Sequence, residues 1–521
     1  MSEVTGRRLA SNSLFAVIEQ VWRIGSRIII TPMIIHRLGM DGYGVWTLLF
    51  TICAYVNAVD ANFGVAYNKL AAEHDAHRDY ARLSQILGAG MTLVGLIALV
   101  ALSGIWLARM PILRFFSVPE PMLVDAGWAL LVVSACVVLR MSVGCAFPVL
   151  QGLQRTDLRN VLSIAASAIE FVVSIVLLLR GWKLLGLAMG HMCGQVTTTI
   201  AAWVLCKRLR PELSFNPLHS TAWGFRQIIS MGGRFQFLSV MQLLIHKGTK
   251  LFTASVLGTF YLGIVEVAEK LITLGVAVGG GLLTPVMPAF SNLQARGDAR
   301  RVQVLFERGS KMMAAVCLPC FAFLAIFAPR LIVLWTGESF PLAAWTVRMI
   351  APVAYLSMLT GMGTAALRAQ GNIRVELFYA LIGAIILVAL YYPGYLWHGY
   401  HGMIGVEVVA GVISAAWFLY AFGRRQKLDL RGYLWGVLAR PVIVMGPLIA
   451  IAIIAAPHTH LTPIFEKVRL NLLVEMTLVG AVFGVLAAGC AWFGMFNIGD
   501  RDSLRNIIAL RRGAAKGVGP A

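Results

Sequence analysis

The chain has 521 residues, 59% of them hydrophobic and 13% charged, and its 44 Lys and Arg outnumber 24 Asp and Glu to give a net charge of +20. This composition, with a mean hydropathy of +0.78, excludes an ordinary soluble globular protein. The gaps between apolar runs are too short for a soluble catalytic domain, so we expect an all-α polytopic membrane protein. The basic residues flank the apolar runs, which favours the anionic cytoplasmic leaflet over nucleic acid as their partner.

Fourteen apolar runs are long enough to cross a bilayer, since a spanning helix needs about 20 mostly apolar residues. Arg7 and Arg8 precede the first run, as in a signal peptide. Because thirteen more runs follow, we interpret the first run as a retained helix. The predicted spans are residues 13–35, 43–66, 84–107, 122–147, 159–179, 183–206, 228–255, 260–288, 310–328, 342–367, 375–396, 401–423, 436–456 and 470–493.

The gaps between the predicted spans differ sharply in positive charge. Alternate gaps, together with the two chain ends, hold 28 Lys and Arg, whereas the gaps on the opposite side hold 8. Lys and Arg gather on the cytoplasmic side of multi-pass proteins. Both termini are therefore expected in the cytoplasm, which also requires an even number of spans.

The sequence repeats itself weakly at an offset of 219 residues. Residues 37–39 align with residues 256–258, and Gly44 aligns with Gly263. The offset covers six spans, so both copies enter the membrane in the same direction, as a parallel repeat about an axis along the membrane normal. The predicted domains are an N-terminal six-helix bundle at 1–206, a cytoplasmic linker at 207–227, a second bundle at 228–423, helices 13 and 14 at 424–493, and a basic tail at 494–521.

Charged residues inside the apolar runs are expensive and usually functional. Predicted helix 1 carries Glu19, Arg23 and Arg27 on one stripe, because they are spaced four residues apart. Predicted helix 7 carries a stripe of the same spacing at the equivalent position, formed by Gln242, His246 and Lys250. Arg binds phosphate through two hydrogen bonds and stays charged. The stripes therefore predict a cationic cavity for an anionic substrate, with structural ion pairs between helices as the alternative.

Other buried charges allow two interpretations. Arg140 could line the same cavity or extend to the membrane surface. Besides Glu19, the carboxylates Glu170, Glu269 and Glu407 are candidates for carrying coupling protons or cations, although their positions favour a structural role for each of these three. Glu266 and Lys270 are expected to satisfy each other.

The sequence shows no Walker A motif, zinc signature or hydrolase triad, so we expect a transporter and not an enzyme. We expect no cofactor and no metal site; the driving force would be an H+ or Na+ gradient, the membrane potential or mass action. Cys317 and Cys320 have the CxxC spacing but lie in an apolar run, which favours packing over redox or metal chemistry.

Residues 31–46 resemble the end of the first helix in polysaccharide exporters and flippases of the MOP (MATE-like) superfamily, which carry Pro, Arg-Leu-Gly and Tyr-Gly at this spacing. Here these are Pro32, residues 37–39 and residues 43–44. Residues 60–64 and 369–372 are similar to two further segments of that family. The resemblance covers residues 10–425.

The resemblance implies a Wzx-type flippase of the bacterial inner membrane. Such proteins move undecaprenyl-pyrophosphate-linked oligosaccharide from the cytoplasmic to the periplasmic leaflet for O-antigen, capsule or exopolysaccharide synthesis, by alternating access. Family members use cationic residues in the lumen, which agrees with Arg23 and Arg27. In the related lipid II flippases, helices 13 and 14 form a groove for the lipid tail.

The expected partners are the lipid-linked oligosaccharide and the membrane, together with polysaccharide polymerase and other glycan-assembly proteins, and we expect a monomer. Three alternatives remain open: a lipid II flippase, a cation-coupled multidrug antiporter of the same fold, and a non-transporting scaffold in a glycan-assembly complex. An acidic cavity would favour the antiporter.

Overall fold

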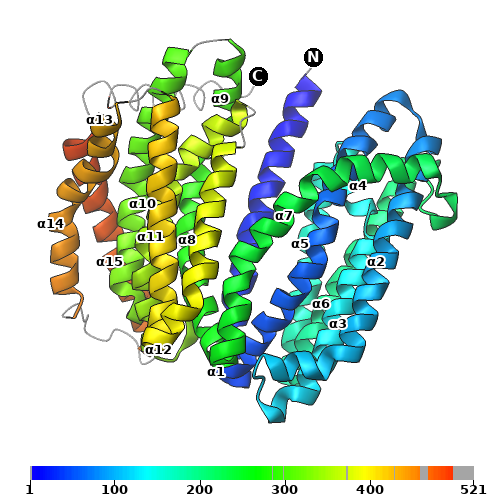
Figure 1. Cartoon of the computed structure of the whole chain (residues 1–521), viewed down its shortest axis with the longest axis horizontal. Coiled ribbons are helices and arrows are strands. Elements are labelled where there is room, and N and C mark those ends of the chain that lie inside the picture. Colours follow the sequence, from blue (N-terminus) through cyan, green and yellow to red (C-terminus); the bar gives the residue numbers. More distant parts are fainter. Residues whose placement is uncertain are drawn as a thin grey trace, which may run out of the picture. The chain divides into compact units, whose positions relative to one another are not determined.

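A computed structural model describes residues 3–283, 286–296, 299–370, 374–426, 429–457, 468–496 and 501, and these residues form helices and no strand (Figure 1). The all-α fold class is therefore confirmed. The helices are α1 (Glu3–His77), α2 (Tyr80–Phe115), α3 (Leu123–Val143), α4 (Ala146–Gly152), α5 (Thr156–Leu179), α6 (Lys183–Leu209), α7 (Ala222–Leu257), α8 (Thr259–Leu283), α9 (Val286–Ala295), α10 (Ala299–Thr336), α11 (Pro341–Ala369), α12 (Arg374–Arg425), α13 (Leu430–Leu434), α14 (Arg440–Ala455) and α15 (Val468–Cys490).

Eight helices among the described residues are long and apolar enough to cross a membrane. Two long helices each contain a pair of predicted spans. α1 runs on through a non-helical Gly39, and α12 runs on through a break at His398 and Gly399. The number of fourteen spans stays a prediction, although the described part of each predicted span is helical or nearly so.

The chain divides into two compact units, Met1–Glu266 and Val267–Ala521. The division falls inside α8, whereas the internal repeat places the linker at 207–227. α7, the first helix of the second predicted repeat, thus belongs to the first compact unit. The bundle boundaries derived from the repeat stay predictions.

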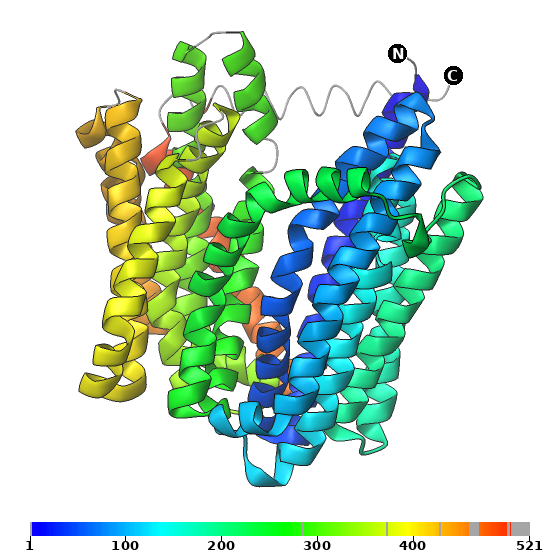
Figure 2. The same ribbon diagram turned by 45° about the vertical axis from the view of Figure 1, so that its right-hand side comes forward.

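In the first unit, α2, α3, α5 and α6 lie beside one another and beside α1 (Figures 1 and 2). Their contact surfaces are apolar, and side chains such as Leu48, Leu87 and Leu130 are completely buried. Small residues let the helices approach closely, as is common between membrane helices. On α6, a Cβ added to Gly190 would lie 2.0 Å from Oγ of Ser174 on α5. These contacts fix α5 and α6 as a tight antiparallel pair.

The beginning of α7 lies across the ends of neighbouring helices, and its later part runs beside α1 (Figure 2). Trp223 anchors the crossing segment. Its ring contacts His74 of α1 edge-on, and the guanidinium carbon of Arg82 lies 5.7 Å from the ring centroid. This segment follows the basic stretch that is predicted to be cytoplasmic. Its tryptophan therefore lies where the sequence predicts the membrane interface, at which Trp residues commonly anchor membrane proteins.

Two glycines that the repeat aligns have the same backbone conformation. Gly39 has φ 73° and ψ 177°, and Gly258 ends α7 with φ 90° and ψ 178°. Only glycine adopts this region without strain, because a Cβ would collide with the backbone. The equivalent bends at the same repeat position give local structural support to the offset of 219.

In the second unit, the helices outside the repeat pack on α10. Arg330 of α10 and Glu475 of α15 form an ion pair at 2.5 Å, with 17% and 9% of their side chains exposed. Phe483 of α15 contacts Phe323 of α10, and Tyr433 of α13 donates a hydrogen bond to Ser310 at 3.2 Å. Predicted helix 14, which is α15, and the short α13 that precedes predicted helix 13 are thus held to α10 by polar as well as apolar contacts.

Candidate functional site

The predicted stripe on α1 is present. The side chain of Arg23 is 50% exposed, and its Nε lies 3.7 Å from Oε1 of Glu19, which is 24% exposed. Arg23 also donates a hydrogen bond to Gln20, and Arg27, one turn further on, is exposed. Glu19 therefore offsets part of the charge of Arg23, and the stripe keeps a net positive charge because it holds two guanidinium groups and one carboxylate.

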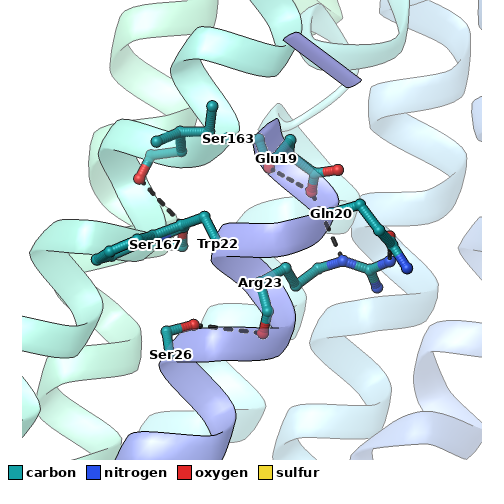
Figure 3. Close-up of polar contacts among 8 residues, drawn as sticks. Glu19, Gln20, Trp22, Arg23, Ser26, Ser163 and Ser167 are labelled. Carbon is teal, nitrogen blue, oxygen red and sulfur yellow. Dashed lines mark hydrogen bonds and ion pairs between the residues drawn. The ribbon is translucent and has the colours of Figure 1, made fainter. Parts of the chain in front are cut away.

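The adjacent face of α1 is fixed to α5. Nε1 of Trp22 donates a hydrogen bond to Oγ of Ser167 at 2.8 Å, and Oγ of Ser163 donates to Glu19 at 3.2 Å. Trp22 also meets Phe171 edge-on. Figure 3 shows Trp22 directed toward Ser167 while Arg23 extends to the other side of α1. The packing with α5 thus sets the direction in which the arginine points.

A second polar pair continues the same face of α5. Ser163, Ser167 and Glu170 are spaced so that they share one side of the helix. Oε1 of Glu170 lies 3.0 Å from Nδ1 of His191 on α6. The sequence analysis named Glu170 but missed His191. The two residues are about equally far along the chain from Gly181, in the turn between α5 and α6, and that spacing is a signal for contact in an antiparallel hairpin.

Lys250 has a partner that the sequence analysis did not assign. It is buried, and its Nζ lies 2.5 Å from Oε2 of Glu266. Glu266 was expected to pair with Lys270, one helical turn away. Lys250 and Glu266 are equally far from Gly258, where the chain turns from α7 into α8, so they face each other across the turn. Lys250 is therefore an ion-pair partner as well as a member of the predicted stripe.

Three other predicted site residues are on α3, α8 and α12. Arg140 on α3 donates a hydrogen bond to Oδ1 of Asn57 in the second part of α1. Glu269 and Glu407 are half-buried and belong to the second compact unit. The side chains of Gln242 and His246 lie outside the described residues.

Beyond the spans, Asp75 near the end of α1 holds the segment that follows α6. Nε and Nη2 of Arg210 donate to its two carboxylate oxygens at 2.7 and 3.3 Å. Partial burial acts to raise the pKa of Asp75, but the hydrogen bonds from Arg210 and Tyr80 and the charges of Arg210 and Arg78 lower it below its ordinary value. The same hydrogen bonds raise the pKa of Arg210. This ion pair joins the end of α1 to the segment after α6 and stabilises the first unit.

Cys317 and Cys320 on α10 are free thiols, as are the other six cysteines. Cys317 is completely buried, and a Cβ added to Gly279 would lie 2.9 Å from its Sγ. Among the described residues, no group of three His, Cys, Asp or Glu side chains is arranged to hold a metal ion. The position of Cys317 is that of a packed core residue.

The arrangement of helices is similar to that of solved membrane transporters. The chain is similar to a multidrug resistance MATE transporter of the MOP superfamily in an inward-facing conformation, with a TM-score of 0.69 and 14% identity over 80% of this chain and 96% of that chain. It is also similar to the lipid II flippase MurJ, with a TM-score of 0.64 and 12% identity over 91% and 98% of the two chains. For the Vibrio cholerae MATE transporter VcmN the values are 0.57 and 13% over 82% and 100%.

These identities are low, so the likenesses define the fold alone, which is MATE-like. The family described as polysaccharide biosynthesis protein matches residues 38–345, which is more than half of the chain. The protein is thus a member of the polysaccharide biosynthesis protein family. No curated protein matches the sequence. The resemblance deduced from residues 31–46 is confirmed.

Proposed function

We propose that the protein is a flippase that moves undecaprenyl-pyrophosphate-linked oligosaccharide from the cytoplasmic to the periplasmic leaflet of the bacterial inner membrane. Membership in the polysaccharide biosynthesis protein family supports a role in making O-antigen, capsule or exopolysaccharide. The MATE-like fold supports transport by alternating access and not catalysis. Both termini are proposed to be cytoplasmic, and the working unit is proposed to be a monomer that contacts the polymerase.

The observation that carries the proposal is the pair of exposed guanidinium groups on α1. Arg23 and Arg27 are about 6 Å apart along the helix axis, a separation that suits the two phosphates of one headgroup. Guanidinium groups replace part of the water that a pyrophosphate loses when it enters the membrane. Because Trp22 fixes the helix against α5, these groups are held in place before the headgroup binds. Gln242 and His246 are proposed to add polar contacts.

The charge of the stripe also separates a flippase from a cation antiporter. A multidrug antiporter for cations on this fold would need a cavity rich in carboxylates, whereas the α1 stripe has two arginines and one glutamate. A lipid II flippase carries the same pyrophosphate on a different sugar, so the stripe fits it equally well. Membership in the polysaccharide family favours the oligosaccharide.

The proposal is tested by mass spectrometry of lipid extracts from cells depleted of this protein. We expect one polyprenyl-pyrophosphate oligosaccharide to accumulate and its surface polymer to disappear, which also identifies the sugar. Wild-type protein should restore both, and so should the control variant Arg180→Glu, which changes an exposed arginine in the turn after α5. An unchanged lipid-linked pool with intact surface glycan would contradict the proposal.

A further inference from the structure

Glu170 and His191 form an ionisable pair that takes no part in the proposed binding of the headgroup. The two side chains are in contact at 3.0 Å and are 35% and 15% exposed, within predicted membrane spans. Ionisable residues at such depth are rare, and chains of Asp, Glu and His are the groups from which transporters build proton relays. Glu170 lies about 14 Å from the end of α5, and His191 about 12 Å from the start of α6. Both are therefore well inside a bilayer core of about 30 Å.

The surroundings of the pair connect it to the arginine stripe. On α5, the same face carries Ser167 and Ser163, which bind Trp22 and Glu19 of α1. A polar line therefore runs from the imidazole on α6, along α5, to the carboxylate that pairs with Arg23.

Several groups face the pair from the helices packed around it. Phe50 of α1 meets the imidazole edge-on at 5.0 Å, and the thiol of Cys136 on α3 lies near Glu170 and the Cys193 thiol of α6. The next charged groups along the polar line are Glu19, Arg23 and Arg159. The pair thus sits among an aromatic ring and two thiols, with the α1 charges at one end of the line.

We propose that Glu170 and His191 form a proton site whose occupancy is linked to binding of the anionic headgroup on α1, so that the pair takes up one proton when the headgroup binds and gives it up when the headgroup leaves. This inference rests on the proposed function. With the proton bound, Nδ1 of the imidazolium donates to the carboxylate and the pair is neutral. Without it, the pair carries one negative charge. A bound pyrophosphate repels that charge and therefore favours the protonated pair.

The linkage is measured with purified full-length protein and undecaprenyl pyrophosphate as the probe. Its Kd is determined between about pH 5 and 8, the range in which histidine titrates. Binding and protonation are reciprocal, so the Kd of the wild type should rise with pH more steeply than the Kd of the double variant Glu170→Gln/His191→Gln. The extra rise should be up to about tenfold per pH unit. The phosphates of the probe titrate in both proteins alike, so the difference between the two pH dependences reports the site. A pH-indicator dye in weak buffer should show more proton uptake on binding by the wild type than by the double variant.

The control is His401→Gln, which removes a histidine packed on Trp345 in the second unit and should keep the wild-type pH dependence. If the double variant does not fold, His191→Gln serves alone, since its amide can still donate to Glu170. Binding with the same pH dependence in wild type and variant would overturn the proton site and leave the flippase proposal intact. Failure of the wild type to bind the probe would overturn the proposed function and the inference that rests on it.

Discussion

Gly44 and Gly263 occupy equivalent positions of the internal repeat, and each packs on the chain segment that carries the other. A Cβ on Gly44 would lie 1.8 Å from the carbonyl oxygen of Thr259, and a Cβ on Gly263 would lie 2.7 Å from the carbonyl oxygen of Met40. Thr259 and Met40 are themselves related by the offset of 219. The contact is therefore reciprocal, as at a two-fold axis. The beginning of α8 and the segment of α1 after its bend therefore meet at the symmetry axis of the repeat.

Gly44→Ala is expected to destabilise the protein by about 1–3 kcal/mol, because backbone atoms would have to move to admit the methyl group. Gly263→Ala should act in the same direction and by less, since part of its contact is with the flexible Met40 side chain. The measurement is the Tm of detergent-purified protein. Gly104→Ala is the control, because nothing lies within 4 Å of its added Cβ. Equal Tm values for Gly44→Ala and Gly104→Ala would refute the close contact.

Trp22→Phe should weaken the attachment of α1 to α5. The variant keeps an aromatic ring but removes a part-buried hydrogen bond to Ser167, which is worth about 0.5–1.5 kcal/mol. We expect a lower Tm and reduced, but not abolished, export of the lipid-linked oligosaccharide. Trp397→Phe is the matched control, because Trp397 is 83% exposed and should be indifferent in both assays. If both variants behave like the wild type, the attachment does not position the stripe.

Asp75→Asn should alter the pH dependence of stability. The folded state holds the pKa of Asp75 below its unfolded value, so its ion pair with Arg210 adds full stability above the ordinary aspartate value near pH 4. That contribution is lost as the pH falls from there through the lowered pKa. Asp75→Asn is therefore expected to lower Tm at neutral pH and to lose less stability than the wild type on acidification. Glu73→Gln, which changes an exposed carboxylate on the same helix end, should follow the wild-type curve.

Glu475→Ala should destabilise the second unit strongly, because it leaves the charge of the mostly buried Arg330 without its carboxylate. Removing one partner of a buried ion pair costs about 3–5 kcal/mol. The double variant Arg330→Met/Glu475→Met removes both charges and should recover most of the lost Tm. A double variant as unstable as Glu475→Ala would show that charge burial is not the reason for the loss.

The sequence predicted the helical architecture and the repeat because both depend on local chemistry. Apolar runs of spanning length indicate helices without any knowledge of tertiary contacts. The backbone conformation at residues 39 and 258 favours glycine, so the sequence carries a signal at both bends. The alignment at 219 was weak in identity, yet it found the two glycines that make reciprocal contacts.

The contacts of the site were less predictable, because they depend on which helices pack together. His191 meets Glu170 only once α5 and α6 form a hairpin. Lys250 reaches Glu266 across the turn at Gly258, a tertiary contact that spacing within a single helix does not predict. The stripe of α1 was predicted from spacing alone, but its attachment through Trp22 and Ser167 needed the neighbouring helix.

The central claim, translocation by a cationic stripe, is tested most directly in proteoliposomes that contain the purified protein and a fluorescently labelled undecaprenyl-pyrophosphate oligosaccharide. A membrane-impermeant quencher reports which leaflet holds the label. Wild-type protein should expose nearly all of the label over time, whereas protein-free liposomes and the Arg23→Glu/Arg27→Glu variant should expose only about half. Equal exposure by the wild type and that variant, with both proteins folded and inserted, would contradict the account.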